Sequence, residues 1–171
     1  MKKAFLFVAT LAAITFYGCS KDDEAGQVVN PQDIGFVFLS VQNNAAEIAL
    51  GQLASDSSQT PEIKAFGQKM VTEHGTTLAE LESIATNIGI NTPDTLQSRH
   101  VKLIEDLKKL KGRSFDSLYI YNQVNDHLNA VLLHENAHAI GSNIQLKTYM
   151  GDVLPHLLSH LQEAQTLAAG Y

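Results

Sequence analysis

Apolar side chains recur at intervals of three and four residues along most of this chain, and this period constrains its fold more than any other feature. Such spacing gathers side chains on one face of an α-helix, whereas a half-buried β-strand requires alternation. No convincing alternating run of β-branched residues is present. We therefore predict an all-α fold. The clearest helical stripe consists of Ile63, Phe66, Met70, His74, Leu78, Leu81, Ala85 and Ile88.

Prolines and glycines divide the chain into five predicted helices. The strongest start has Thr60 as N-cap and Pro61 in the first helical position, and Gly89 closes the same helix. Pro155 should kink the last helix. Four long helices and one short crossover helix favour a four-helix bundle that forms a single domain over residues 33–171. The predicted spans are 33–54, 61–88, 98–111, 114–140 and 144–169.

Two of these helices have predicted interior faces that the structure can test. In the span 33–54 the recurring apolar residues are Phe36, Val37, Val41, Ile48 and Leu53, and we expect this nearly uncharged helix to be buried on most faces. In the span 114–140 the recurring apolar residues are Leu118, Val124, Leu128, Val131 and Leu132. There we expect the inward face to consist of Ile120, Val124, His127 and Val131, which share one face at spacings of three and four. Asp33 and Ser114 are the expected N-caps of these two helices.

The beginning of the chain has the pattern of a secretory signal. Lys2 and Lys3 precede an uncharged apolar stretch that is too short to span a bilayer, and Cys19 follows it directly. The alternative is a short buried N-terminal helix. The segment resembles a bacterial lipoprotein signal, which implies a signal peptide over residues 1–18 and acyl chains on Cys19 as a membrane anchor.

The residues after this cysteine bear on localisation. They form a polar stretch, 19–32, that we interpret as a tether. Ser20 stands where an inner-membrane retention signal would have Asp, which favours the outer membrane. Lys21-Asp22-Asp23 is similar to the export tag of surface lipoproteins in one Gram-negative group. We therefore predict an outer-membrane lipoprotein on the periplasmic face or at the cell surface.

Composition excludes several classes of function. The chain has 12 Lys and Arg against 18 Asp and Glu, a net charge of −6, so it lacks the basic footprint of a nucleic-acid-binding protein. A single Cys precludes an intramolecular disulfide and a Cys-based zinc site. No His-Glu-x-x-His, serine elbow or phosphate loop is present. We predict no catalytic residues.

Four ionisable residues fall where a helical core should be apolar. Glu47 is the single ionisable side chain in the 22 residues from 34 to 55. It either reaches solvent at the edge of its stripe or, if buried, requires a cation, a metal or a proton. His74, His127 and His160 continue the apolar stripes of three further long helices. Each alone is more often a hydrogen-bonded core histidine, but side chains from facing helices of a bundle converge on common sites.

Imidazole nitrogen and carboxylate together favour a transition metal such as Zn, Cu, Fe or Ni over Ca or Mg. Glu135 and His138 have the i, i+3 spacing of di-metal bundles, but no second Glu-x-x-His occurs. Two i, i+4 histidine pairs could also bind a metal by themselves. These pairs are His134/His138 and His156/His160.

Residues 33–169 resemble the ferritin-like domain of unknown function found in bacterial periplasmic and predicted outer-membrane proteins. The resemblance rests on Glu47 with Leu50-Gly51-Gln52-Leu53-Ala54, Pro61 to Gly67 leading to Met70-Val71-Thr72-Glu73-His74, Phe115 to Tyr119 before Gln123 and His127, and Leu154-Pro155-His156 before His160-Leu161. It implies a ferritin-like bundle with Glu47, His74, His127 and His160 as its polar set. Glu135 falls where many members have an acid, whereas His134 falls where an aromatic residue is usual, which does not support a role for His134.

Three functions remain open at this point. The chain is an anchored bundle that binds a transition metal through its core His and Glu residues. Alternatively, it is a non-catalytic envelope module with a hydrogen-bonded polar core and a protein partner that the sequence does not identify. A di-metal oxidoreductase is the third, weakened by the missing second Glu-x-x-His. The metal content of untagged protein would separate them.

Overall fold

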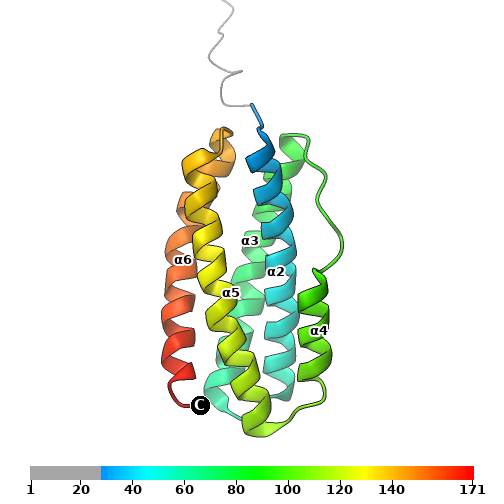
Figure 1. Cartoon of the computed structure of the whole chain (residues 1–171), viewed down its shortest axis with the longest axis vertical. Helices are drawn as coiled ribbons and strands as arrows, with labels where there is room; N and C mark the ends of the chain where they lie inside the picture. The colour runs from blue at the N-terminus through cyan, green and yellow to red at the C-terminus, as the bar shows by residue number, and fades with distance from the viewer. Residues whose placement is uncertain (1–27) are drawn as a thin grey trace, which may run out of the picture.

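The computed structural model describes residues 28–171, and within this range it contains five helices and no strand. They are α2 (Pro31–Ser57), α3 (Pro61–Asn87), α4 (Ser98–Leu107), α5 (Gly112–Ile140) and α6 (Ile144–Ala168) (Figure 1). The predicted all-α fold is confirmed. The predicted signal peptide, Cys19 and most of the predicted tether lie outside the described residues. No helix of the described part is long and apolar enough to cross a membrane.

The four long helices form two hairpins that pack against each other. Helices α2 and α3 make one hairpin, α5 and α6 make the other, and α4 lies outside the bundle beside α2 and α5 (Figure 1). The extended segment between α3 and α4 lets the chain cross from the first hairpin to the second. The predicted bundle with one short crossover helix is therefore the observed arrangement.

Helix α3 begins and ends as the sequence predicts. Thr60 occupies the N-cap position and Pro61 follows it, although the Thr60 hydroxyl donates to the carboxylate of Asp116 instead of capping the helix. At the other end Gly89 has a φ of 75°, and the N–H of Ile90 donates to the carbonyl of Ala85. This is a Schellman ending, which favours glycine because a side chain is strained at positive φ.

Several predicted boundaries differ from the structure because local hydrogen bonds override them. Helix α2 starts at Pro31, two residues before the predicted start, since Asn30 and Asp33 form a reciprocal capping box. Helix α4 ends at Leu107 instead of residue 111, so the lysines expected in its last turn follow it. Helix α5 starts at Gly112, where a φ of 54° turns the chain, and not at Ser114.

The inward face predicted for α5 is confirmed, because Ile120, His127 and Val131 are buried and Val124 is half-buried. Leu118, Leu128 and Leu132 are 36%, 47% and 48% exposed, while Val131 is buried. Their spacing is helical, but it belongs to the outer face of the helix. The inner face follows a different stripe that includes polar residues, namely Phe115, Tyr119, Ile120, Gln123, His127 and Val131. In α2, Phe36, Val37 and Val41 are buried as predicted, whereas Ile48 and Leu53 are half-buried.

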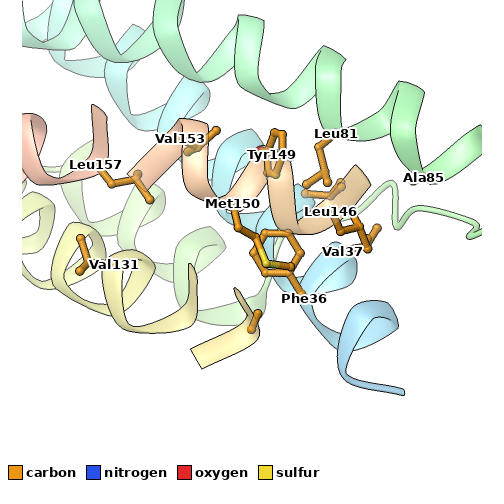
Figure 2. Packing of buried hydrophobic residues seen from close by; sticks show 12 residues of the cluster. Phe36, Val37, Leu81, Ala85, Val131, Leu146, Tyr149, Met150, Val153 and Leu157 are labelled. Carbon is orange, nitrogen blue, oxygen red and sulfur yellow. The ribbon is translucent and has the colours of Figure 1, made fainter. Parts of the chain in front are cut away.

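Two apolar clusters make up the core, one toward each end of the bundle. The first cluster surrounds Phe36 and Tyr149, and Figure 2 shows its side chains from all four long helices. The second cluster surrounds Phe66 and Tyr119 at the opposite end. Between them every long helix contributes buried polar side chains, which we call the polar layer. Its members are Asn44, Glu47, His74, Gln123, His127 and His160.

Helices α2 and α3 approach each other closely at two glycines. A Cβ atom on Gly51 would lie 2.6 Å from the carbonyl oxygen of Gly67, and a Cβ on Gly67 would lie 2.6 Å from that of Gly51. The two backbones therefore touch where both residues lack a side chain. Because the helices are antiparallel, Asn44 and His74, each seven residues along from these glycines, face each other two turns away. The glycine contact thus sets the register of the polar layer.

Candidate metal centre

Three histidines from three helices converge in the polar layer. His74 of α3, His127 of α5 and His160 of α6 are all buried, and one ring nitrogen of each lies within 4.8 Å of the others. The ring centroids are 5.3 to 5.5 Å apart, so the rings surround a common point. The three histidines predicted from their apolar stripes are therefore brought together. We call them the histidine cluster.

The side chain of Asn44 fixes the tautomer of His74. Asn44 donates from Nδ2 to the carbonyl of Ser40 at 2.9 Å, which turns its Oδ1 toward His74. This oxygen lies 2.8 Å from His74 Nδ1 and can only accept a hydrogen bond. His74 Nδ1 therefore carries the proton, and Nε2 is left with a lone pair that points into the cluster.

A backbone carbonyl fixes the tautomer of His127 in the same way. His127 Nδ1 donates to the carbonyl oxygen of Gln123, one turn earlier on α5, at 2.9 Å. Its Nε2 is consequently also a bare acceptor. His74 Nε2 and His127 Nε2 lie 3.4 Å apart. Two neutral rings held in these tautomers have no proton to share across this gap, so the contact sets two lone pairs against each other.

The third ring is held by an acidic side chain. His160 Nε2 donates to Glu73 Oε2 at 2.7 Å, whereas His160 Nδ1 is buried and has no hydrogen-bond partner among the described residues. A histidine whose one nitrogen is hydrogen-bonded to a carboxylate or carbonyl, and whose other nitrogen is free, is the usual arrangement of a metal ligand. All three rings of the cluster have this arrangement.

The cluster is uncharged at neutral pH. Burial lowers the pKa of His74 well below its usual value, and the neighbouring His127 lowers it further. Burial also lowers the pKa of His127, to about 4. The pKa of His160 is lowered by burial, against the opposing effect of its hydrogen bond to Glu73. The neutral form of each ring is therefore favoured at pH 7, so a proton does not relieve the facing lone pairs of His74 and His127.

A pocket connects the cluster to the surface between α3 and α6. It has a volume of about 310 Å³, and His74 and His160 form part of its wall. Three acidic side chains line it as well, those of Glu73, Glu80 and Asp152. An acidic pocket favours a cation over an anion. The histidine cluster is thus accessible on one side through a pocket that suits a positively charged ligand.

Glu47 lies in the polar layer but outside the histidine cluster. It is 6% exposed, and its Oε2 accepts a hydrogen bond of 2.7 Å from Nε2 of Gln123. Burial raises the pKa of its carboxyl to about 8, and the nearby Asp126 adds to this effect. The structure therefore places Glu47 one turn from the cluster, as a carboxyl that is mostly protonated at neutral pH.

The secondary candidates do not join the histidine cluster. Glu135 and His138 are exposed on α5, and His156 is 71% exposed at the pocket. His134 is buried, but its Nδ1 donates to the carbonyl of Ala130 and its ring packs edge-on against Phe36 at 5.0 Å. It occupies the place of an aromatic core residue, in keeping with the family position noted above.

The residues that orient the cluster, Asn44 and Glu73 through their side chains and Gln123 through its backbone carbonyl, were not predicted as site residues. Asn44, Gln123 and Glu73 hold the three rings, yet none belongs to a recognisable ligand motif. One pattern could have found Asn44. Asn44 is a polar residue three positions, or about one helical turn, before Glu47, so the two side chains lie on one face of the helix. Because that helix is nearly uncharged, this face is expected to be buried.

Fold and site together define a class: a ferritin-like helical bundle whose core carries a polar layer with converging histidines. The chain belongs to the family described as "Domain of unknown function (DUF4142)", whose sequence model matches residues 19–167. The resemblance to a domain of unknown function is thereby confirmed. No match is found among curated proteins.

Two solved structures share the fold. The DUF305 fragment from Deinococcus radiodurans has a TM-score of 0.74 at 11% identity, over 84% of this chain and 99% of that chain. A two-domain protein from Anabaena variabilis that contains DJ-1/ThiJ/PfpI-like and ferritin-like domains has a TM-score of 0.62 at 13% identity, over 83% of this chain and 38% of that chain. At such identities the likeness concerns the fold alone, and it confirms the predicted ferritin-like four-helix bundle.

Proposed function

We propose that this domain binds one transition-metal ion through His74, His127 and His160. The observation that carries the proposal is the 3.4 Å contact between two nitrogens whose protons are both engaged elsewhere. Burying two lone pairs face to face is unfavourable, and a proton that would relieve it is disfavoured by the lowered pKa of both rings. A cation placed between the nitrogens turns the repulsion into two bonds.

The geometry supports a tetrahedral ion of the size of Zn²⁺. With metal–nitrogen bonds of about 2.0–2.1 Å, the edge of such a tetrahedron is about 3.3–3.4 Å, close to the His74–His127 distance. The third nitrogen lies within 4.8 Å and needs a side-chain movement of about 1 Å to join them. The fourth position would face the pocket between α3 and α6, where a water or another small ligand completes the coordination.

The donor set supports Zn²⁺ or Cu ahead of the hard cations Ca²⁺ and Mg²⁺, since neutral imidazole is its only ligand type. Each ring also keeps a partner that orients it, which in metal sites strengthens binding by about 10- to 100-fold. We propose binding or sensing of the ion as the role of the site. It does not require the second Glu-x-x-His that a di-metal oxidase would need.

Metal-dependent melting of untagged protein, residues 19–171, tests the proposal. A ligand present at about 100 times its Kd stabilises the native state by about 2.7 kcal/mol, which corresponds to a rise in Tm of about 5–10 °C for a domain of this size. We expect Zn²⁺ or Cu²⁺ to produce this rise at pH 7 with one equivalent bound. The rise should vanish toward pH 4, where protons compete for the imidazoles.

The matched variants are His127→Ala and His134→Ala. Both histidines are buried on α5 and donate from Nδ1 to the carbonyl four residues earlier, but only His127 belongs to the cluster. Both substitutions should lower the metal-free Tm, and only His127→Ala should abolish the metal-induced rise. An equal rise in both variants, or none in the wild type, would contradict the site and leave the envelope interaction module as the better hypothesis.

We further propose that acyl chains on Cys19 anchor the domain at the outer membrane. The sequence supports this through the basic start, the apolar stretch and the Gly18-Cys19 pair, followed by Ser20. Cys19→Ala should move the protein from the membrane fraction to the soluble fraction and abolish acyl labelling, whereas Ser20→Ala should retain labelling and membrane attachment. Unchanged membrane attachment of Cys19→Ala would refute the anchor.

A further inference from the structure

Glu47 is tied to the histidine cluster through Gln123. The side-chain amide of Gln123 donates to Glu47 Oε2, and the backbone carbonyl of the same residue accepts from His127 Nδ1. Glu47 also follows Asn44, the partner of His74, by three residues on α2. Two independent connections therefore place the carboxyl about one helical turn, or about 5 Å along the bundle axis, from the cluster.

No cationic side chain of the described part of the chain is in contact with Glu47. From α5 it faces Gln123, the hydroxyl group of Tyr119 and the carboxylate of Asp126. Arg99 of α4 attracts it only weakly, because the guanidinium is bound to Asp126 at 2.8 Å. Within residues 28–171 Glu47 forms no ion pair. The carboxyl group thus sits in a site that suits its neutral form.

We propose that Glu47 is the proton-releasing counter-charge of the metal centre: when the histidine cluster takes up a divalent ion, the Glu47 carboxyl group loses its proton, and the resulting carboxylate offsets part of the buried positive charge. The inference rests on the proposed function, and it assigns Glu47 a role other than that of a ligand. In the balance of this step, an O–H bond of Glu47 breaks and the proton leaves to solvent. No electron is transferred.

Electrostatics makes this exchange favourable at neutral pH. Before binding, a carboxyl with a pKa of about 8 is about nine-tenths protonated at pH 7. If the separation is taken as about 8 Å, two positive charges at an effective dielectric constant of about 20–40 favour the ionised form by a factor of about 30 to 1,000. This is sufficient to ionise most of the Glu47 population.

The histidine ligands cannot supply this proton. Ordinary histidine sites release protons on metal binding because the free imidazoles are partly protonated near neutral pH. Here burial lowers the pKa of all three rings, that of His127 to about 4, so the neutral form of each is favoured from pH 7 upward. Proton release between pH 6.5 and 8 therefore reports on Glu47, apart from a water on the ion, which can also ionise near pH 7.

Calorimetric titration with Zn²⁺ in buffers of different ionisation enthalpy measures the number of protons released. We expect wild-type protein to release close to one proton more per ion at pH 7 than Glu47→Gln, and this difference to fall to near zero at pH 9. The amide of the variant keeps the oxygen that accepts from Gln123 and cannot ionise. Any proton released by a water bound to the ion is released in both proteins, so it cancels when the proton count of Glu47→Gln is subtracted from that of the wild type.

A control variant and the pH dependence of the zinc affinity complete the test. Glu82→Gln, an exposed acid on α3, should release as many protons as the wild type. From pH 6.5 to 8 the affinity of the wild type should rise up to about tenfold per pH unit, more steeply than that of Glu47→Gln. Equal proton release by the wild type and Glu47→Gln, with Zn²⁺ bound to both, overturns this inference alone. Absence of binding to the wild type overturns it together with the metal site, and loss of all binding in Glu47→Gln would make Glu47 a ligand instead.

Discussion

Gly51→Ala should destabilise the protein, although alanine is the better helix former. The added Cβ would lie 2.6 Å from the carbonyl oxygen of Gly67 and 3.0 Å from the Cβ of Met70. A backbone oxygen cannot turn away as a long side chain does, so α2 and α3 must separate. Overpacking of this kind costs about 2–3 kcal/mol, and the gain from Gly to Ala in a helix returns about 1 kcal/mol. We expect a net loss of about 1–2 kcal/mol.

Gly35→Ala is the matched control on the same helix. A Cβ on Gly35 meets nothing within 4 Å, so only the helix propensity changes, and the protein should gain about 0.5–1 kcal/mol. Urea denaturation of both variants at pH 7 with a chelator present should therefore give free energies of unfolding that differ from the wild type in opposite directions. A Gly51→Ala protein as stable as Gly35→Ala would refute the close approach of the two helices.

The same substitution should also weaken the metal centre. Asn44 and His74 lie two turns from the glycine contact, and moving the helices apart lengthens the 2.8 Å hydrogen bond that sets the His74 tautomer. Loss of such an orienting bond weakens metal binding by about 10- to 100-fold. Zinc titration should thus show lower affinity in Gly51→Ala and wild-type affinity in Gly35→Ala.

Three further predictions concern charged side chains. The metal-free protein should lose about 2 kcal/mol of stability between pH 6.5 and 8, because folded Glu47 holds a proton that its unfolded counterpart releases near pH 4.5; the Glu47→Gln protein should not show this loss in urea titrations. Asp33→Ala should lower the free energy of unfolding by about 3 kcal/mol, because the buried carboxylate accepts hydrogen bonds at the start of α2 and from the α5–α6 turn. Asp94→Ala, which removes an exposed carboxylate, should change the stability little, and equal Tm values for the two variants would contradict this prediction. Glu73→Gln should weaken zinc binding by about 10- to 100-fold through His160 while leaving the metal-free fold intact, and an unchanged Kd would show that Glu73 does not orient the ring.

The helical period and the end signals were sufficient to predict the bundle. Pro61 and Gly89 marked α3 correctly because their effects are local, acting through a fixed φ and a left-handed turn. The interior face of α5 was predictable because Ile120, His127 and Val131 recur at helical spacing. The structure buries all three, whereas Leu128, next to His127 in sequence, is exposed on the outer face.

The histidine cluster was predictable because each of its members interrupts an apolar stripe at the correct interval. The hydrogen bonds that orient the cluster were not predictable, because they depend on the rotation and register of α2 against α3 and of α6 against α3. Glu73 is the clearest case: it is half-exposed on α3, so no burial pattern marks it, yet it fixes the orientation of His160 from the facing helix. The separation of Glu47 from the cluster by one turn is likewise a matter of register.

The polar layer is costly for the fold, and this cost supports the proposed metal site. A bundle of this size would gain stability if the two apolar clusters were joined by leucine or methionine, as buried polar networks replaced by packed apolar side chains show. Instead the layer leaves His160 Nδ1 and Gln123 Oε1 buried without a partner among residues 28–171, and it sets two lone pairs 3.4 Å apart. Hydrogen bonding alone would be expected to leave few such atoms. The proposed cation among the three rings, balanced by an ionisable Glu47 one turn away, would give the same residues a favourable arrangement and would recover the cost of the layer in the bound state.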